Sequence, residues 1–446
     1  MKTIQIRFDD SLPALVDALL PLLGADALEQ GTVLRDATGR LCFFCTQPAG
    51  LETSDTTLNQ ALANALGPYA RPGRTVVFAD EPGASAMLAS PERIPVKVAG
   101  VFCHLVDRRI VGSGWLSTPT IRSASPARIV FSTLKGGVGR STALAVTAAD
   151  LARRAFNVLV VDLDLEAPGL GDLMLDEESI PDYGVIDFLV ENGLSGVDDI
   201  SLSSFLASSR LTEAGGGRVD VMPALGRKSQ TNPENVLPKL SRAMIEDITD
   251  QGSITVEQQI STMIERATRA SSYDVVLIDS RAGLSELAAP AVLGIGANVL
   301  LFGTAQKQTI EGYRSLFAAL QLLAQRDRAQ SRTAEWRLAL RPVYAKASSN
   351  PDIERRFIDE MYELYSEHLY DAEDEPVNDG DLVRFVRDDN SAPHWPLTIP
   401  FNQSFIDFDP LRTPGQLTAP FYEQAFRPFL NAIDAIIAAP LNISPP

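Results

Sequence analysis

Cysteine and histidine are scarce in this sequence, which has three of each among its 446 residues. An odd number of cysteines and no recognisable signal peptide predict a reduced, cytoplasmic protein rather than a disulfide-stabilised secreted one. Cys42 and Cys45 form a C-x-x-C pair, a spacing that also occurs in zinc sites. The segment CFFC nevertheless has the composition of a buried strand, in which residues three positions apart face opposite sides. We therefore favour a strand over a zinc site here.

Long apolar runs are also missing, because no stretch reaches the roughly 20 residues that span a bilayer. The most apolar stretch, Leu287–Phe302, is interrupted by proline, glycine and asparagine, and it predicts a helix followed by a buried strand. Phe421–Ala438 has an apolar helical face but a single basic residue, Arg427. Membrane adsorption of such a helix needs cationic support. We therefore expect this segment to pack on the body of the protein, and we do not expect a membrane partner.

Positive charge is in short supply, with 39 lysines and arginines against 57 acidic residues and a formal net charge of −18. The basic residues cluster no further than in pairs such as Arg108-Arg109. Non-specific DNA binding and adsorption to anionic membranes both depend on clustered lysine and arginine. The charge balance argues against both and favours protein partners and small anions held in a shaped pocket.

What the sequence does contain is typical of a folded protein of two or three domains, with 45% apolar and 22% charged residues. Residues 1–116 predict a small α/β domain without a catalytic motif. Residues 117–127, rich in serine, threonine and proline, predict a linker. Residues 128–440 alternate β-branched runs with helical segments, which predicts a doubly wound, mostly parallel sheet, and residues 441–446 form a tail. The candidate strands are Ile129–Ser132, Val158–Val161, Val219–Met222, Val275–Ile278, Val299–Phe302 and Leu338–Tyr344.

A glycine-rich loop lies between a buried strand and a helix in the segment Arg128–Thr142, RIVFSTLKGGVGRST. Glycines let backbone N–H groups wrap a phosphate, and the helix N-terminus adds partial positive charge directed at the same anion. The hydroxyl of Ser141 is placed to reach Mg²⁺. A glycine-rich loop can arise by chance, but here strand, loop, basic residues, hydroxyls and helix follow in order. The segment therefore predicts a P-loop that binds ATP with Mg²⁺.

Carboxylates follow two further strands. The run NVLVVDLD ends in Asp162 and Asp164, which lie on the same side of the pleat, and YDVVLIDSRAG places Asp279 after another buried strand. Alone, each aspartate would be interpreted as solvating a strand end. Because ligands bind at the carboxyl ends of parallel strands, these side chains are expected beside the phosphate site. They are candidates to hold Mg²⁺ or to orient an attacking water.

Together these three motifs resemble the MinD/ParA family of deviant Walker A ATPases. The family pattern is K-G-G-x-G-K-[ST], then D-x-D, then D-x-x-x-G, and this sequence has KGGVGRST, DLDLEAPGL and DSRAG. The segments RVDVMPAL (218–225) and TIPF (398–401) resemble later parts of the family. The resemblance covers about residues 127–438. It implies a doubly wound P-loop domain that hydrolyses ATP and forms a homodimer around ATP and Mg²⁺.

The resemblance also implies roles for individual residues. Lys135 is in the position of the signature lysine, which reaches the partner subunit's nucleotide, and Asp164 is in the position associated with water activation. Mg²⁺ would be held by Ser141 and supported by Asp162 and Asp279. The remaining residues expected at the nucleotide are Gly136, Gly137, Val138, Gly139, Arg140, Thr142 and, beside the adenine, Pro400.

Arg140 is the main departure from the family, which has lysine at this position. Arginine keeps the charge but is a longer, planar fork. We therefore expect nucleotide binding to survive and hydrolysis to be slow or absent, with Arg140, Lys135 and Asp164 as the catalytic candidates. Three hypotheses remain: an ATP-dependent switch that controls a protein partner through its N-terminal domain, a non-hydrolysing regulatory or scaffold subunit, and a DNA-partitioning ATPase, which the charge disfavours.

Overall fold

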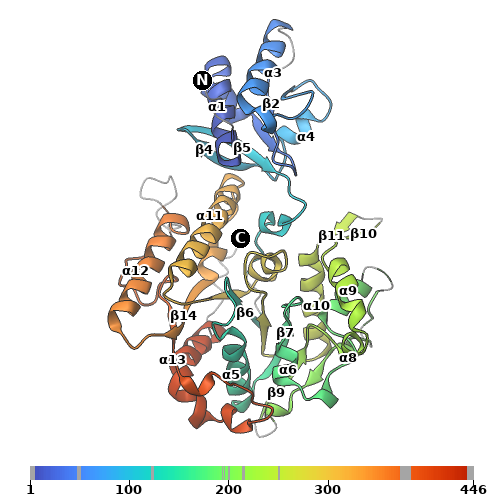
Figure 1. Ribbon diagram of the computed structural model, residues 1–446, viewed down its shortest axis with the longest axis vertical. Coiled ribbons are helices and arrows are strands. Elements are labelled where there is room, and N and C mark those ends of the chain that lie inside the picture. Colours follow the sequence, from blue (N-terminus) through green and yellow to red (C-terminus); the bar gives the residue numbers. More distant parts are fainter. Residues whose placement is uncertain are drawn as a thin grey trace. The chain divides into compact units, whose positions relative to one another are not determined.

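The computed structural model describes residues 6–47, 52–121, 125–192, 194, 196–198, 201–212, 216–249, 252–371 and 383–438. The chain divides into two compact units. The N-terminal unit consists of Met1–Leu116 together with Ala319–Ala334, and the larger unit consists of Ser117–Ala318 and Glu335–Pro446. The predicted tail lies outside the described residues. The sequence did not indicate that a later segment belongs to the N-terminal unit. Helix α11 (Lys307–Ala329, Figure 1) contributes residues to both units.

The N-terminal unit has a five-stranded mixed sheet in the order β3-β2-β1-β5-β4. A hairpin joins β1 to β2, and Gly39 in its turn has a φ of +87°, which favours glycine. The elements of this unit are α1 (Phe8–Leu23), α2 (Ala25–Gln30), β1 (Thr32–Arg35), β2 (Leu41–Cys45), α3 (Glu52–Leu66), β3 (Val76–Phe78), α4 (Ala84–Leu88), β4 (Ile94–Val98) and β5 (Val101–Asp107).

Strand β2 has two buried faces. Phe43 and Cys45 belong to the cluster formed with α1 and α3, whereas Cys42 and Phe44 pack with Ala84 of α4. The prediction of a buried strand at CFFC is confirmed, and its two thiols lie on opposite sides of the sheet. This placement keeps the C-x-x-C pair from converging on one ion.

The larger unit is organised around an eight-stranded sheet in the order β15-β14-β13-β6-β12-β7-β9-β8. All neighbouring strands are parallel except β8 and β9. The six candidate strands are confirmed as members of this sheet, with one correction: Leu338 lies in a 3₁₀ turn, and the strand begins at Leu340. The strands are β6 (Ala127–Thr133), β7 (Asn157–Asp162), β8 (Ala207–Ser208), β9 (Arg218–Met222), β12 (Val275–Asp279), β13 (Asn298–Gly303), β14 (Leu340–Ala347) and β15 (Leu397–Pro400).

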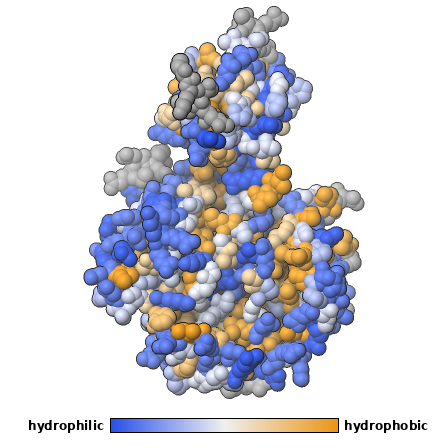
Figure 2. All heavy atoms as spheres, viewed as in Figure 1, coloured by the Kyte–Doolittle hydropathy of each residue, from blue (hydrophilic) through white to orange (hydrophobic). Residues whose placement is uncertain are grey.

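Helices cover this sheet, and a short separate hairpin lies outside it. Between Leu287 and Phe302 the expected helix is a π-helical turn, η7 (Pro290–Gly294), and β13 follows as predicted. The other elements are α5 (Arg140–Arg153), α6 (Leu170–Met174), α7 (Val185–Glu191), α8 (Arg227–Thr231), α9 (Val236–Ala243), β10 (Asp247–Thr249), β11 (Gly252–Ile254), α10 (Val256–Ala270), α12 (Pro351–His368) and α13 (Ala419–Ala438). Helix α12 buries Phe357, Met361 and Tyr365 and presents mainly hydrophilic side chains on its visible face (Figure 2).

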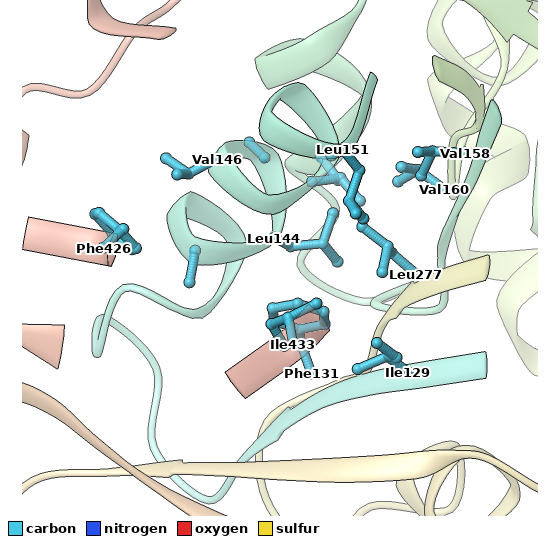
Figure 3. Packing of buried hydrophobic residues seen from close by; sticks show 14 of the residues in the cluster. Ile129, Phe131, Leu144, Val146, Leu151, Val158, Val160, Leu277, Phe426 and Ile433 are labelled. Carbon is cyan, nitrogen blue, oxygen red and sulfur yellow. The ribbon is translucent and has the colours of Figure 1, made fainter. Parts of the chain in front are cut away.

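Helix α5, which follows the P-loop, lies in the main apolar core. It packs on β6, β7 and β12, and α13 packs against both α5 and β15. Figure 3 shows side chains of α5, β6, β7, β12 and α13 pointing into one shared core. The apolar face of α13, with Phe426, Phe429 and Ile433, is buried there, which confirms that this helix packs on the body. Within the described part of the chain, no helix has the length and hydrophobicity to cross a bilayer.

Candidate nucleotide site

The P-loop joins β6 to α5 and has the conformation of an anion cradle. Gly137 and Gly139 have φ values of +76° and +91°, which side chains other than glycine rarely adopt. A Cβ at Gly136 or Gly137 would meet no atom within 4 Å, so the loop's surface is open. Val138, by contrast, is buried and anchors the loop to the core. Open backbone at the start of a 14-residue helix suits a bound phosphate.

The predicted carboxylates meet beside this loop. Strand β12 lies between β6 and β7, and its last residue, Asp279, is in register with Phe131 on one side and Asp162 on the other. Because all three strands are parallel, their carboxyl ends open onto the same edge of the sheet. Asp164 lies two residues beyond the end of β7. The tertiary structure thus brings Asp279 beside two motifs that lie more than 100 residues earlier in the sequence.

Arg140 has a buried side chain, 9% exposed, that lies among these carboxylates. Its Nη2 donates to Asp164 Oδ2 at 3.0 Å and to Asp279 Oδ2 at 3.2 Å. Its Nε forms an ion pair with Asp279 Oδ1 at 2.5 Å, and its Nη1 donates to the Ser280 carbonyl. Burial lowers the pKa of the guanidinium, but Asp279 and Asp164 outweigh that effect and raise it overall. Arg140 therefore stays charged and connects the loops that follow β7 and β12.

The oxygen ligands predicted for Mg²⁺ also lie together. Ser141 Oγ donates to Asp279 Oδ2 at 2.7 Å. Asp162 accepts the backbone N–H groups of Asp164 at 3.0 Å and Leu170 at 3.2 Å. Burial, together with the negative charge of Asp279, raises the pKa of Asp162, and burial raises the pKa of Asp279 against the opposing effect of Arg140. Hydroxyl and carboxylate oxygens are the donors that Mg²⁺ prefers, so this set fits the ion.

Lys135 is exposed at the tip of the loop, away from the buried ion pairs. Its ammonium donates to Gln306 Oε1 at 3.2 Å, and its backbone is fixed by the hydroxyl of Thr133. Thr142 is half-buried in the first turn of α5. Pro400 is exposed at the end of β15 and pairs with Ala347 of β14.

Several residues at the site were not found from the sequence. Lys346, near the end of β14, donates from Nζ to the carbonyl of Gly137 at 2.7 Å. Arg281 forms an ion pair with Glu166 at 2.8 Å and so provides a second connection between the loops after β12 and β7. Gly283, by contrast, is the glycine of the DSRAG segment already noted in the sequence; it has a φ of +89° and donates its N–H to the carbonyl of Thr133. None of the new polar contacts follows a recognisable motif, because each pairs residues far apart in the chain.

Comparison with known proteins gave one family match and several similar solved structures. Residues 127–332 match the family model described as an AAA domain. No curated protein matches the chain significantly. Among solved structures, the MinD cell division protein of Aquifex aeolicus covers 69% of this chain and 96% of its own length, at 16% identity and a TM-score of 0.40. A ParA family ATPase from Chlorobium tepidum TLS covers 54% and 81%, at 17% identity and a TM-score of 0.36. The Cyanothece McdA–ATP complex covers 50% and 71%, at 13% identity and a TM-score of 0.31.

A parallel sheet, a glycine-rich loop opening a helix and strand-end aspartates beside that loop define a P-loop nucleotide-binding domain. The match to the AAA domain family model over residues 127–332 includes the glycine-rich loop and the strand-end aspartates.

Proposed function

We propose that this protein is an ATP-dependent molecular switch, in which the phosphates of bound ATP act on two loops through Arg140. The observation that carries the proposal is the bridge from Arg140 to Asp164 on one loop and to Asp279 and Ser280 on the other. A charged side chain that bridges two loops has two alternative positions when an anion competes with the carboxylates: one paired with the carboxylates and one paired with the anion. Phosphate in the cradle supplies such an anion.

Each group of the chain has a defined part in this switch. The backbone of Gly136–Gly139 and the N-terminus of α5 bind phosphate, and Arg140 exchanges carboxylate contacts for phosphate contacts. Asp164, once released from Arg140, is the base or orienting group for the attacking water. Mg²⁺, held by Ser141 and Asp279 with support from Asp162, would neutralise phosphate charge and polarise the terminal phosphoryl group.

Dimerisation would be the output of the switch. Lys135 is exposed, and its side-chain hydrogen bond to Gln306 at 3.2 Å is an exchangeable surface contact. This leaves the ammonium able to reach the nucleotide of a second copy. The N-terminal unit would recruit the protein partner, and its neighbouring Ile110 and Val111, 83% and 78% exposed, are apolar side chains that such a partner would cover.

The second candidate is a non-hydrolysing regulatory or scaffold subunit. It is favoured by the same contact, because an Arg140 that keeps Asp164 paired at 3.0 Å would leave no free carboxylate to activate water. In that case ATP would stay bound and stabilise one assembly. The net charge of −18 leaves a DNA-partitioning role as the weakest of the three.

One set of measurements separates these functions. ATP binding, phosphate release and mass in solution are measured on the full-length chain with Mg²⁺, beside Lys135→Ala, Asp164→Ala, Arg140→Lys and the control Lys228→Ala on α8. For the switch we expect ATP to produce a dimer and slow turnover, with turnover lost in Lys135→Ala and Asp164→Ala and kept in the control. Binding without turnover would establish the scaffold function instead, and a failure of wild type to bind ATP would refute both. ATP-dependent, salt-sensitive DNA binding would revive the third hypothesis.

A further inference from the structure

A lysine of β14 reaches the P-loop from a strand two positions away in the sheet. Lys346 lies where the pairing of β14 with β15 is irregular: Ala345 pairs with Ile399 and Ala347 with Pro400, so Lys346 has no partner across the ladder. Its φ of +51° falls in the left-handed region, which lysine rarely adopts. Bulges of this kind redirect a side chain, and they occur next to active sites. Here the bulge directs Lys346 toward the P-loop.

The ammonium of Lys346 lies against the backbone of the P-loop. Nζ is 2.7 Å from the carbonyl oxygen of Gly137, and Cε is 4.0 Å from the position that a Cβ would take on Gly139. The side chain is exposed, so solvent and solutes reach it. An ammonium has three donors, and the Gly137 carbonyl takes one of them. Two N–H groups therefore remain for an anion bound in the cradle.

The other cations at the loop are engaged elsewhere. Arg140 is buried and faces Asp164 and Asp279. Lys135 reaches Gln306. Among the described residues, Lys346 is thus the cation whose side chain lies against the loop at the two glycines with positive φ, Gly137 and Gly139. Its charge adds to the field of the α5 N-terminus at the place where phosphate binds.

We propose that Lys346 is a phosphate-binding residue of this nucleotide site and makes first contact with the phosphates of ATP or ADP while Arg140 is still paired with its carboxylates. Binding of phosphate by Lys346 holds the nucleotide in the cradle, and Arg140 then exchanges its partners. This inference rests on the proposed nucleotide binding and adds a residue that the P-loop motif does not contain. The competing role is structural, in which the 2.7 Å contact only ties β14 to the loop.

The test compares Lys346→Met with Lys346→Arg and with Lys228→Met, which removes the same charge from an exposed lysine of α8. Affinities for ATP and ADP are measured by calorimetry at two salt concentrations, with urea unfolding of each nucleotide-free variant. We expect Lys346→Met to weaken both nucleotides about tenfold, the loss of one charged hydrogen bond, and to reduce the salt dependence of binding. Lys346→Arg should restore most of the affinity, and Lys228→Met should match wild type.

A second measurement uses the wild-type chain and does not depend on how the variants fold. Lysine acylation is followed by mass spectrometry with and without ATP, and we expect ATP to protect Lys346 several-fold while Lys228 reacts equally in both samples. Wild-type affinity in Lys346→Met, or equal acylation of Lys346 with and without ATP, would overturn the assignment while leaving the proposed function intact. Reduced stability with unchanged affinity would establish the structural role and also overturn it. A wild-type chain that binds no nucleotide would refute the proposed function and this inference together.

Discussion

The bridge made by Arg140 can be tested by replacing the side chain with an apolar one of similar length. Arg140→Met removes the guanidinium and leaves Asp164 and Asp279, 7% and 2% exposed, without their cation. Breaking a buried ion pair by removing one partner costs about 3–5 kcal/mol, because the remaining charge is buried and uncompensated. Arg140 serves two carboxylates and the Ser280 carbonyl. We therefore expect the free energy of unfolding of the larger unit to fall by about 4 kcal/mol at pH 8.

The pH dependence of this loss has a defined sign. Burial raises the pKa of Asp279, and Arg140 opposes the increase, so removing Arg140 raises that pKa further. A carboxyl whose pKa is higher in the folded than in the unfolded state contributes stability that is complete below the unfolded pKa and is lost as the pH rises through the folded pKa. The deficit of Arg140→Met relative to wild type should therefore shrink as the pH falls from 8 to 5.

The assay is urea denaturation of the nucleotide-free chain in a chelator, with hydrogen exchange of peptides from β6 and β12 to assign the transition to the larger unit. The double variant Arg140→Met/Asp279→Asn is the matched control. It removes one of the two buried carboxylates left without a cation and should recover about 2 kcal/mol of the lost free energy of unfolding. A deficit below about 1 kcal/mol in Arg140→Met, or one that does not depend on pH, would show that the bridge is not formed in the free protein.

Two further predictions concern the core and the loop. Phe429→Ala should lower the free energy of unfolding by about 3–5 kcal/mol, because Phe429 is fully buried and its ring centroid lies 6.4 Å from that of Phe131 and 6.0 Å from that of Phe302. The control Asn431→Ala, on the exposed side of α13, should change the free energy of unfolding by less than about 0.5 kcal/mol. An equal loss in both variants would contradict the packing of this helix. Gly139→Ala should cost about 1–2 kcal/mol, since its φ is +91°, and should also weaken ATP binding. Gly136→Ala, which has ordinary φ and open space for a Cβ, is the stability control and should unfold like wild type.

Much of the fold and half of the site could be predicted from the sequence. The strands of the larger unit are runs of β-branched and apolar residues, and such runs report burial directly. The P-loop was recognisable because its function requires particular residues in a fixed order: glycines for the turn, a helix start and a hydroxyl. Asp162 and Asp279 followed for the same reason, since each ends a buried strand, and parallel strands open onto one edge.

What the sequence did not reveal depends on contacts between distant segments. The residue type at position 140 was evident, but its orientation toward Asp164 and Asp279, rather than toward solvent, follows from how three strand ends meet. Leu338 was assigned to a strand because its neighbours are apolar, yet it lies in a turn, since strand ends are set by pairing with β13 rather than by hydropathy. The joining of Ala319–Ala334 to the N-terminal unit is likewise a matter of packing.

The sequence by itself therefore determined the class of fold, the position of the glycine-rich loop and the residue types available beside it, because these depend on local backbone freedom and residue type. The tertiary structure alone decided which basic side chain pairs with which carboxylate or carbonyl oxygen. Lys346 lies 209 positions from Gly137 and contacts it through a bulge at the end of β14. No local pattern records such a contact, since it depends on the pairing of strands and on one unusual backbone angle.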